Sequence, residues 1–397
     1  MDTPDNIPSR RSFLGTMLAL AAGTSGRSPA GPPDRLDALA ATEKVMHDFV
    51  TTRMMDADGL CRSFLCAATL APWTNEDLAK TDQRLITDMF QNSSDKAGCL
   101  TYENALMATG EFAVSQIVRH RVTHDAAARE RAQKAIRAIL AVIEEGRSYQ
   151  PGWLPKPFGG VRNARNSHET SPDQYTKALV ALHAWRPLAS EEERSRIDRF
   201  FVDAADFYIA TKFRLAFRHR TIVTADTHHH ALGLFVSLIV LAARASGDAR
   251  YLKHLAVLSP AMDAALKDDG LANFNMTSLV AEGYHVAMQN GHEDPRLPQT
   301  IKRLWQIGTK RIDAAGEGYE DGKPPRRDAQ ATRLAAIATF VEKLDPTTRA
   351  TDLAPKILSR QTDVRRMTHT RLPECIAEVS ITSWLVAYWR LREAASR

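Results

Sequence analysis

The sequence has few cysteines and lacks the short motifs that mark several large enzyme classes. Its four cysteines, at positions 61, 66, 99 and 375, form no C-x-x-C pair, which argues against a zinc ribbon or a thioredoxin-like site. H-E-x-x-H, G-x-S-x-G, a Walker A loop and a Rossmann glycine fingerprint are also absent. We expect the cysteines to be small buried apolar residues, since a chain of 397 residues builds a core without disulfides. A Cys61–Cys66 disulfide is the alternative.

Strong charge of one sign and long apolar runs are likewise missing. The net charge of +5 permits an acidic ligand without requiring one. No basic stripe with interleaved aromatics occurs, so nucleic acid is not an expected partner. No segment reaches the roughly 20 apolar residues of a membrane-spanning helix, so we expect no stable span in the mature form.

The N-terminus does carry a recognisable pattern. Arg10 and Arg11 lie in S-R-R-S-F-L-G, and an apolar run follows over 16–22. The segment resembles a Tat export signal, whose usual form is S/T-R-R-x-F-L-K. The resemblance implies the Tat export machinery as a partner and a periplasmic or secreted mature protein. We therefore divide the chain into a signal peptide over 1–30 and one domain over 31–397. An uncleaved anchor is the alternative, because Pro29 makes the expected cleavage site unfavourable.

The rest of the chain has mostly helical periodicity. We predict helices over 34–53, 75–90, 102–121, 125–145, 173–186, 190–212, 227–246, 248–267, 276–289, 296–313, 327–343 and 376–394. Some segments, such as 231–241, are apolar all round, whereas others, such as 191–201, are amphipathic. Their alternation predicts an all-α fold with buried inner helices and amphipathic outer helices, which is an α/α toroid of helical hairpins. An open α-solenoid is the alternative.

The long segment 146–172 is the first candidate for a site. It is rich in Gly, Pro and aromatics, and loops of this length are uncommon unless functional or disordered. Trp153 and Phe158 are candidates for stacking on a sugar ring. Three basic residues are candidates for contacting a carboxylate: Arg162, Arg165 and His168. A structured surface loop with aromatic plugs is the alternative.

Acidic residues open two of the predicted inner helices. Asp173 lies in the first turn of the helix that follows the long loop, and Glu103 opens the helix from 102. Helix capping explains part of this pattern, because Ser171, Pro172 and Gln174 suit a helix start. It does not explain Glu169 or Tyr175. We therefore take Asp173 and Glu103 as candidate catalytic residues and Glu169, Gln174 and Tyr175 as candidate substrate contacts.

Histidines form the third cluster. Asp226 is a plausible cap before His228, His229 and His230, which point about 100° apart on a helix and so cannot all bind one ion. We expect His229 to act as acid or base, with Asp226 and His228 as substrate contacts. Tyr284 and His285 are further candidates on a later helix. Glu282 and His285 form one E-x-x-H, whereas a di-iron bundle needs two, so we expect no metal and no cofactor.

These helical pairs and helix-opening acids resemble the six-hairpin (α/α)6 glycosidase-like proteins, which include unsaturated glucuronyl hydrolases and toroid polysaccharide lyases. In the hydrolases, acids at the starts of inner helices act on the sugar, and one protonates its unsaturated ring. By position, Glu103 and Asp173 are similar to those two acids, although the family commonly has Asp at the first site.

Three functions follow. The first is an exported glycoside hydrolase that uses paired carboxylates on an oligosaccharide, including one that contains a uronate. The second is a polysaccharide lyase. Its candidate bases are Tyr175, Tyr284, His229 and His285. Its candidate neutralisers are Asn104, Gln174 and Arg165. The third is a non-catalytic carbohydrate-binding protein that keeps only the aromatic platform.

Overall fold

The computed structural model describes residues 32–81, 93–216, 221–223, 230–267 and 273–396. The signal peptide expected over 1–30 lies outside these ranges, as do three candidate residues, Asp226, His228 and His229. None of the described helices combines the length and the apolar composition needed to cross a bilayer.

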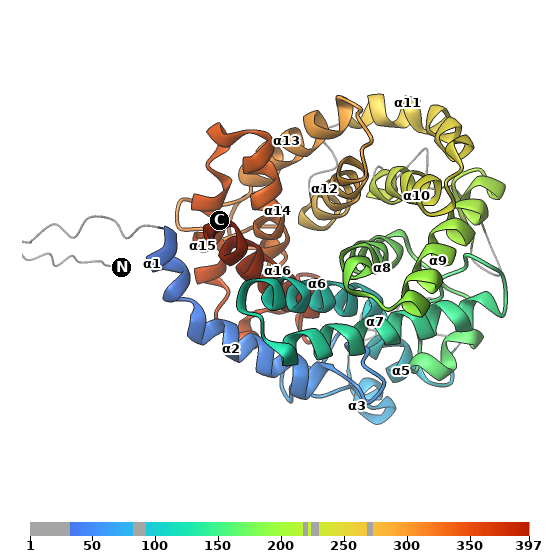
Figure 1. Cartoon of the computed structure of the whole chain (residues 1–397). Coiled ribbons are helices and arrows are strands. Elements are labelled where there is room, and N and C mark those ends of the chain that lie inside the picture. The colour runs from blue at the N-terminus through green and yellow to red at the C-terminus, as the bar shows by residue number, and fades with distance from the viewer. Residues whose placement is uncertain (1–31, 82–92, 217–220, 224–229, 268–272, 397) are drawn as a thin grey trace, which may run out of the picture.

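Six described helices form a closed inner ring (Figure 1). Each contacts the next one, and the last, α16, packs against the first, α6. In ring order they are α6 (Ala105–Thr123), α8 (Pro172–Trp185), α10 (His230–Ser246), α12 (Phe274–Gln289), α14 (Ala331–Leu344) and α16 (Glu378–Ala395). Their apolar residues occur at every helical angle, so these helices are buried on almost all sides.

A second set of helices lies outside the ring, and each precedes an inner helix along the chain (Figure 1). They are α2 (Ala40–Phe49), α7 (Ala126–Arg147), α9 (Glu191–Ala210), α11 (Leu255–Ala265), α13 (Arg296–Thr309) and α15 (Ala350–Arg360). They are amphipathic: α7 buries Ala132, Ile136 and Ile143 on one face. The inner helices therefore all run in one direction, and the chain is an all-α (α/α)6 toroid, which confirms the toroid predicted from the periodicity and the six hairpins implied by the resemblance.

A few predicted helices differ from the structure. The helix predicted from 102 begins at Ala105, since the three residues before it form a turn. The segment predicted over 248–267 contains a short 3-10 helix, η5 (Ala249–His254), before α11. Helix α15 is missing from the predicted set because Pro355 lies inside it, and proline ordinarily breaks a helix.

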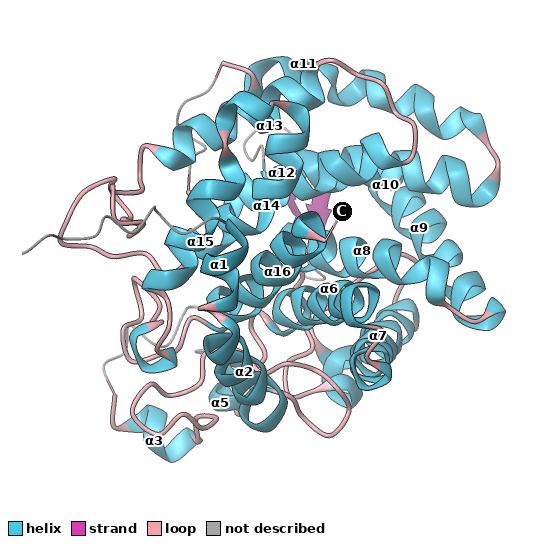
Figure 2. Cartoon of the chain, turned by 60° about the vertical axis from the view of Figure 1, so that its left-hand side comes forward, coloured by secondary structure: helices cyan, strands magenta, loops and turns pink. Residues whose placement is uncertain are grey.

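The remaining elements are short and lie mainly at the periphery (Figure 2). The helical ones are α1 (Pro32–Asp37), η1 (Val50–Met54), α3 (Asn75–Ala79), α5 (Lys96–Thr101), η3 (Val161–Asn166), η4 (Arg186–Leu188), η6 (Pro346–Thr348) and η7 (Val364–Arg366). Strands β1 (Arg214–Ala216) and β2 (Thr221–Val223) form an antiparallel pair in which Arg214 lies opposite Val223.

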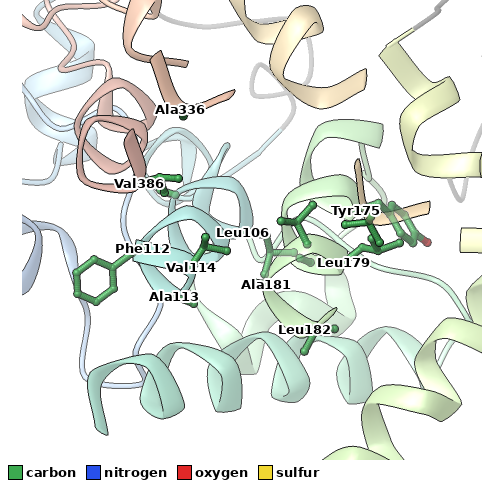
Figure 3. Packing of buried hydrophobic residues seen from close by; sticks show 14 of the residues in the cluster. Leu106, Phe112, Ala113, Val114, Tyr175, Leu179, Ala181, Leu182, Ala336 and Val386 are labelled. Atoms are coloured by element: carbon green, nitrogen blue, oxygen red, sulfur yellow. The ribbon is translucent and has the colours of Figure 1, made fainter. Parts of the chain in front are cut away.

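Small residues let the inner helices approach closely. A Cβ atom on Gly283 of α12 would lie 2.2 Å from the carbonyl oxygen of Gly233 on α10. Larger side chains fill the space elsewhere, as Leu106 of α6 and Leu179 of α8 do in Figure 3. The ring is thus a packed core and not an open pore.

Charged side chains meet inside the ring. Lys177 of α8 lies 3.0 Å from Glu111 and also pairs with Glu282, which accepts a 2.9 Å hydrogen bond from Arg390. Arg333 lies 3.4 Å from Glu111. We call these five residues the axial ion cluster. Burial alone would raise the pKa of Glu282, but Lys177 and Arg390 lower it to about 2.

Candidate active site

The amino-terminal ends of the inner helices meet at one end of the toroid, because those helices are parallel. Polar side chains gather there from five helix starts. They are Glu103 and Asn104 before α6, Asp173 and Gln174 on α8, Asn275 on α12, Arg333 on α14 and Glu378 on α16. Helix amino termini carry partial positive charge, which favours carboxylates at this end.

Glu103 is held by a buried cation from the long loop. Its Oε1 accepts a hydrogen bond from the Lys156 ammonium group, and Lys156 is almost fully buried. The backbone N–H of Lys156 donates to the carbonyl of Glu169 at 2.9 Å, which fixes the loop there. The loop therefore brings a charged group to the helix end, in addition to the aromatics that its composition predicts.

Gln174, the residue after Asp173, hydrogen-bonds to the backbone around Glu103. Its Nε2 donates to the carbonyl of Glu103 at 2.7 Å, and its Oε1 accepts the N–H of Leu106 at 3.3 Å. That N–H belongs to the first turn of α6 and has no partner within the helix. The neighbouring Asp173 is partly exposed in the first turn of α8. Gln174 is buried, and its two hydrogen bonds brace the starts of α6 and α8.

Glu378 is a third carboxyl at this end, and the sequence reasoning missed it. It is fully buried at the start of α16, and its Oε2 accepts the N–H of Phe64 at 3.0 Å. Burial raises its pKa to about 7, against the opposing effects of the Phe64 hydrogen bond, the Asn104 amide and the Arg333 charge. Glu378 opens an apolar helix just as Glu103 and Asp173 do, so the same signal points to it.

Two strained or buried groups adjoin Glu378. Phe64 has a φ of 47°, in the left-handed region that an L-residue with a bulky side chain rarely adopts. Arg333 has no exposed surface and donates to Asn275 Oδ1. It also belongs to the axial ion cluster, so it connects that cluster to this end of the ring.

The structure places three predicted aromatic contacts in the core. Trp153 is 2% exposed and packs edge-on against Phe207. The hydroxyl of Tyr175 donates to the Gly152 carbonyl at 2.6 Å and accepts the Leu154 N–H at 2.7 Å. Tyr284 is also fully buried. These residues anchor the loop and the helices, which corrects the expectation that they face a substrate.

The other loop candidates lie in four different settings. Phe158 is half-buried, with its ring 6.0 Å from the Lys156 ammonium group, so it remains near the carboxyl groups. Arg165 pairs with Glu145 of the outer helix α7 at 2.8 Å, so it is not available to neutralise a substrate. Arg162 and His168 are exposed, and Glu169 is buried.

His285 lies at the opposite end of the toroid. It stacks on Phe340 with 4.2 Å between ring centroids, and it lines a pocket of about 460 Å³ among the carboxyl-terminal halves of the inner helices. Burial lowers its pKa to about 3. The structure therefore separates His285 from Glu103 and Asp173, contrary to the expectation of one shared site.

Among the described residues, no three His, Cys, Asp or Glu side chains are placed to hold a metal ion.

The sequence matches no protein-family model, and no curated protein is detectably similar to it. Two of the solved structures to which the chain is similar illustrate its fold. One is an unsaturated glucuronyl hydrolase specific for heparin, with a TM-score of 0.57, 9% identity, and coverage of 92% of this chain and 99% of that chain. The other is a D-mannose isomerase, with a TM-score of 0.52, 10% identity, and coverage of 90% and 97%. The structural similarity shows that the fold is the same. Sequence identities this low do not show that the reaction is the same.

Proposed function

We propose that the protein is an exported glycoside hydrolase that acts on a uronate-containing oligosaccharide. The observation that carries the proposal is the group of carboxyls at one end of the ring, where Glu103 is ion-paired with Lys156 and braced against the start of α8. Most glycoside hydrolases use two carboxyl groups that flank the bond to be cleaved.

Asp173 is assigned the acid–base role, because it is partly exposed and lies in the first turn of an inner helix. Glu103 is assigned to binding and orienting the sugar, since Lys156 and Gln174 fix its side chain and its backbone. On an unsaturated uronate, proton transfer to the ring and addition of water give an unstable product. That product opens and releases the next sugar.

The fold similarity to an unsaturated glucuronyl hydrolase supports this substrate class. The lyase alternative loses support from three of its four candidate bases, because Tyr175 and Tyr284 are buried and His285 lies at the other end of the ring. The fourth, His229, lies outside the described residues. The non-catalytic alternative loses support as well, because Trp153, one of the two aromatic residues of its platform, is inside the core and only Phe158 remains half-buried. Export rests on the Arg10–Arg11 pattern.

The test follows the ultraviolet absorbance of unsaturated uronyl groups while the mature protein is mixed with lyase-made fragments of acidic polysaccharides. The proposal expects the absorbance to fall, and expects Asp173→Asn and Glu103→Gln to slow the fall by about 100-fold or more. Asp248→Asn is the matched control, since Asp248 opens η5 on the outer surface. A rise in absorbance on intact polymer would indicate a lyase, and equal rates for all three variants would remove the assignment.

A further inference from the structure

A small, strongly basic pocket lies between the segments that precede α14 and α16. It has a volume of about 280 Å³. Its charged lining residues are four arginines and one carboxylate: Arg326, Arg327, Arg360, Arg366 and Glu317. We call this site the arginine pocket. The four guanidinium groups carry four positive charges, and the lining contains one carboxylate to balance them. The pocket therefore favours an added anion.

Two of these four positive charges have carboxylate partners and two do not. Arg326 pairs with Glu320 at 3.2 Å and with Asp321 at 3.5 Å, and Arg327 lies 3.9 Å from Glu317. Arg360 donates to the carbonyl of Ala315 at 3.0 Å. In the part of the chain that the structure describes, neither Arg360 nor Arg366 has a carboxylate within 4.0 Å. An incoming anion would therefore meet cations that are not already paired.

His369 adds a neutral donor to the same pocket. Its Nδ1 accepts the backbone N–H groups of Arg371 and Leu372, both at 3.2 Å. The proton of the neutral ring must therefore lie on Nε2, which becomes a donor. Burial, reinforced by the charge of Arg371, lowers the pKa of His369, so the ring is neutral near pH 7. Guanidinium and imidazole N–H donors together suit the oxygens of a sulfate or a carboxylate.

The arginine pocket adjoins the candidate active site. The ring of His369 contacts the ring of Phe64 edge-on, with 5.4 Å between centroids. The N–H of Phe64 in turn donates to Glu378. One residue, Phe64, thus separates the arginine pocket from the carboxyl group of Glu378.

We propose that the arginine pocket binds a sulfate or carboxylate group on a saccharide whose reacting end occupies the candidate active site. This inference rests on the proposed function and specifies its substrate further: an oligosaccharide with an acidic group beyond the reacting sugar. The same chemistry also fits a free inorganic anion, so the test must separate the two sources.

The experiment measures binding of three probes to the full mature chain by calorimetry: sodium sulfate, a sulfated tetrasaccharide and its desulfated form. The variants are Arg366→Gln and the double variant Arg360→Gln/Arg366→Gln. Arg250→Gln is the control, because Arg250 is 82% exposed on the outer element η5. We expect the double variant to bind the sulfated tetrasaccharide at least ten-fold more weakly, with the desulfated probe and the control unchanged.

The remaining outcomes are also decisive. Weaker binding of sulfate alone, with saccharide binding unchanged, would show a free-anion site and overturn the saccharide assignment. Equal affinities for all variants would overturn the arginine pocket itself. Repeating the titration with Asp173→Asn keeps this test separate from catalysis, since that variant should lose turnover and keep the effect of the arginines. Should the wild-type protein prove inactive on uronates, the same binding differences would still support the pocket.

An independent observation concerns two cysteines. Cys66 and Cys375 lie directly opposite each other across an antiparallel bridge. The flanking hydrogen bonds, from Ala67 N–H to the Glu374 carbonyl and from Ile376 N–H to the Leu65 carbonyl, are both 2.8 Å. Cys66 and Cys375 are thus a non-hydrogen-bonded pair, in which Cα atoms are about 4.5 Å apart. That separation lies within the range that disulfides span.

We propose that Cys66 and Cys375, which are free thiols in this structure, form a disulfide under oxidising conditions. The half-buried Cys66 attacks a small disulfide such as glutathione disulfide and releases one glutathione as a thiol. The buried Cys375 then displaces the second glutathione, with both protein thiol protons passing to the released thiols. The bond would tie the segment that carries Phe64 to the segment that precedes α16.

Peptide mapping after treatment of the full chain with glutathione disulfide tests this. We expect one Cys66–Cys375 link, reversal by dithiothreitol, and a melting temperature several degrees higher in the oxidised chain. Cys66→Ser should abolish the link and Cys99→Ser should not. A link between another pair, or only a glutathione adduct at Cys66, would overturn the proposal.

Discussion

Replacing Glu378 with glutamine should change stability in a way that depends on pH. The pKa of Glu378 is raised by burial to about 7, from an ordinary value of 4.5. Between these values the unfolded chain releases a proton that the folded chain keeps, so stability falls as pH rises. At 1.36 kcal/mol per pH unit, the loss over about 2.5 units is about 3 kcal/mol. The Glu378→Gln variant avoids this loss, and its amide oxygen still accepts the Phe64 N–H.

Urea denaturation of wild type and variant at pH 5 and pH 8 measures the effect. Because pH 5 already lies above the ordinary value, the free energy of unfolding of the variant, relative to wild type, should rise by about 2–3 kcal/mol between the two pH values. Glu191→Gln is the matched control, because Glu191 is an exposed glutamate at the first position of α9, and its difference should stay flat. A flat difference for Glu378→Gln, or one that falls with pH, would refute the buried protonated carboxyl.

Three further outcomes can be measured. Lys156→Met should cost about 3 kcal/mol in urea denaturation because it leaves Glu103 partly buried without its cation, and Lys156→Met/Glu103→Gln should recover most of that loss. Gly283→Ala should cost about 1–3 kcal/mol, since its Cβ meets rigid backbone, whereas Gly308→Ala meets only the movable end of a leucine and should be near neutral. His285→Gln should leave kcat/KM within about two-fold of wild type, because His285 lies at the opposite end from Asp173.

The fold was predictable because the distribution of apolar residues around each helix shows how many of its sides are buried. A helix buried on all sides must be apolar at every angle, and an outer helix must be apolar on one face only. The segment around Leu234 and the charged segment from Glu191 differ in just this way. Closure of the ring was the less local part, since it depends on contacts between α16 and α6, far apart in the chain.

The candidate site residues were predictable only where their position at the start of a helix indicates a functional role. Glu103 and Asp173 could be read from helix starts. The roles of Trp153 and Tyr175 could not, because an aromatic residue in a loop looks the same whether it plugs the core or faces solvent. Their burial follows from packing against α9, which no local pattern reveals. The partner of Glu103, Lys156, was missed for the same reason.

The axial ion cluster has a consequence for how a saccharide is cleaved. Lys177, Glu111, Glu282 and Arg333 are each at most 3% exposed and fill the interior between the two ends of the ring. A chain of sugars therefore cannot thread through the toroid, and must enter and leave by the end that holds Glu103. We therefore expect a saccharide that enters at this end to present its terminal sugar to Glu103 and Asp173. Mass spectrometry of products should accordingly show release of terminal sugars from a uronate oligosaccharide. Internal fragments appearing first would mean that the saccharide lies across the end of the ring instead of entering it.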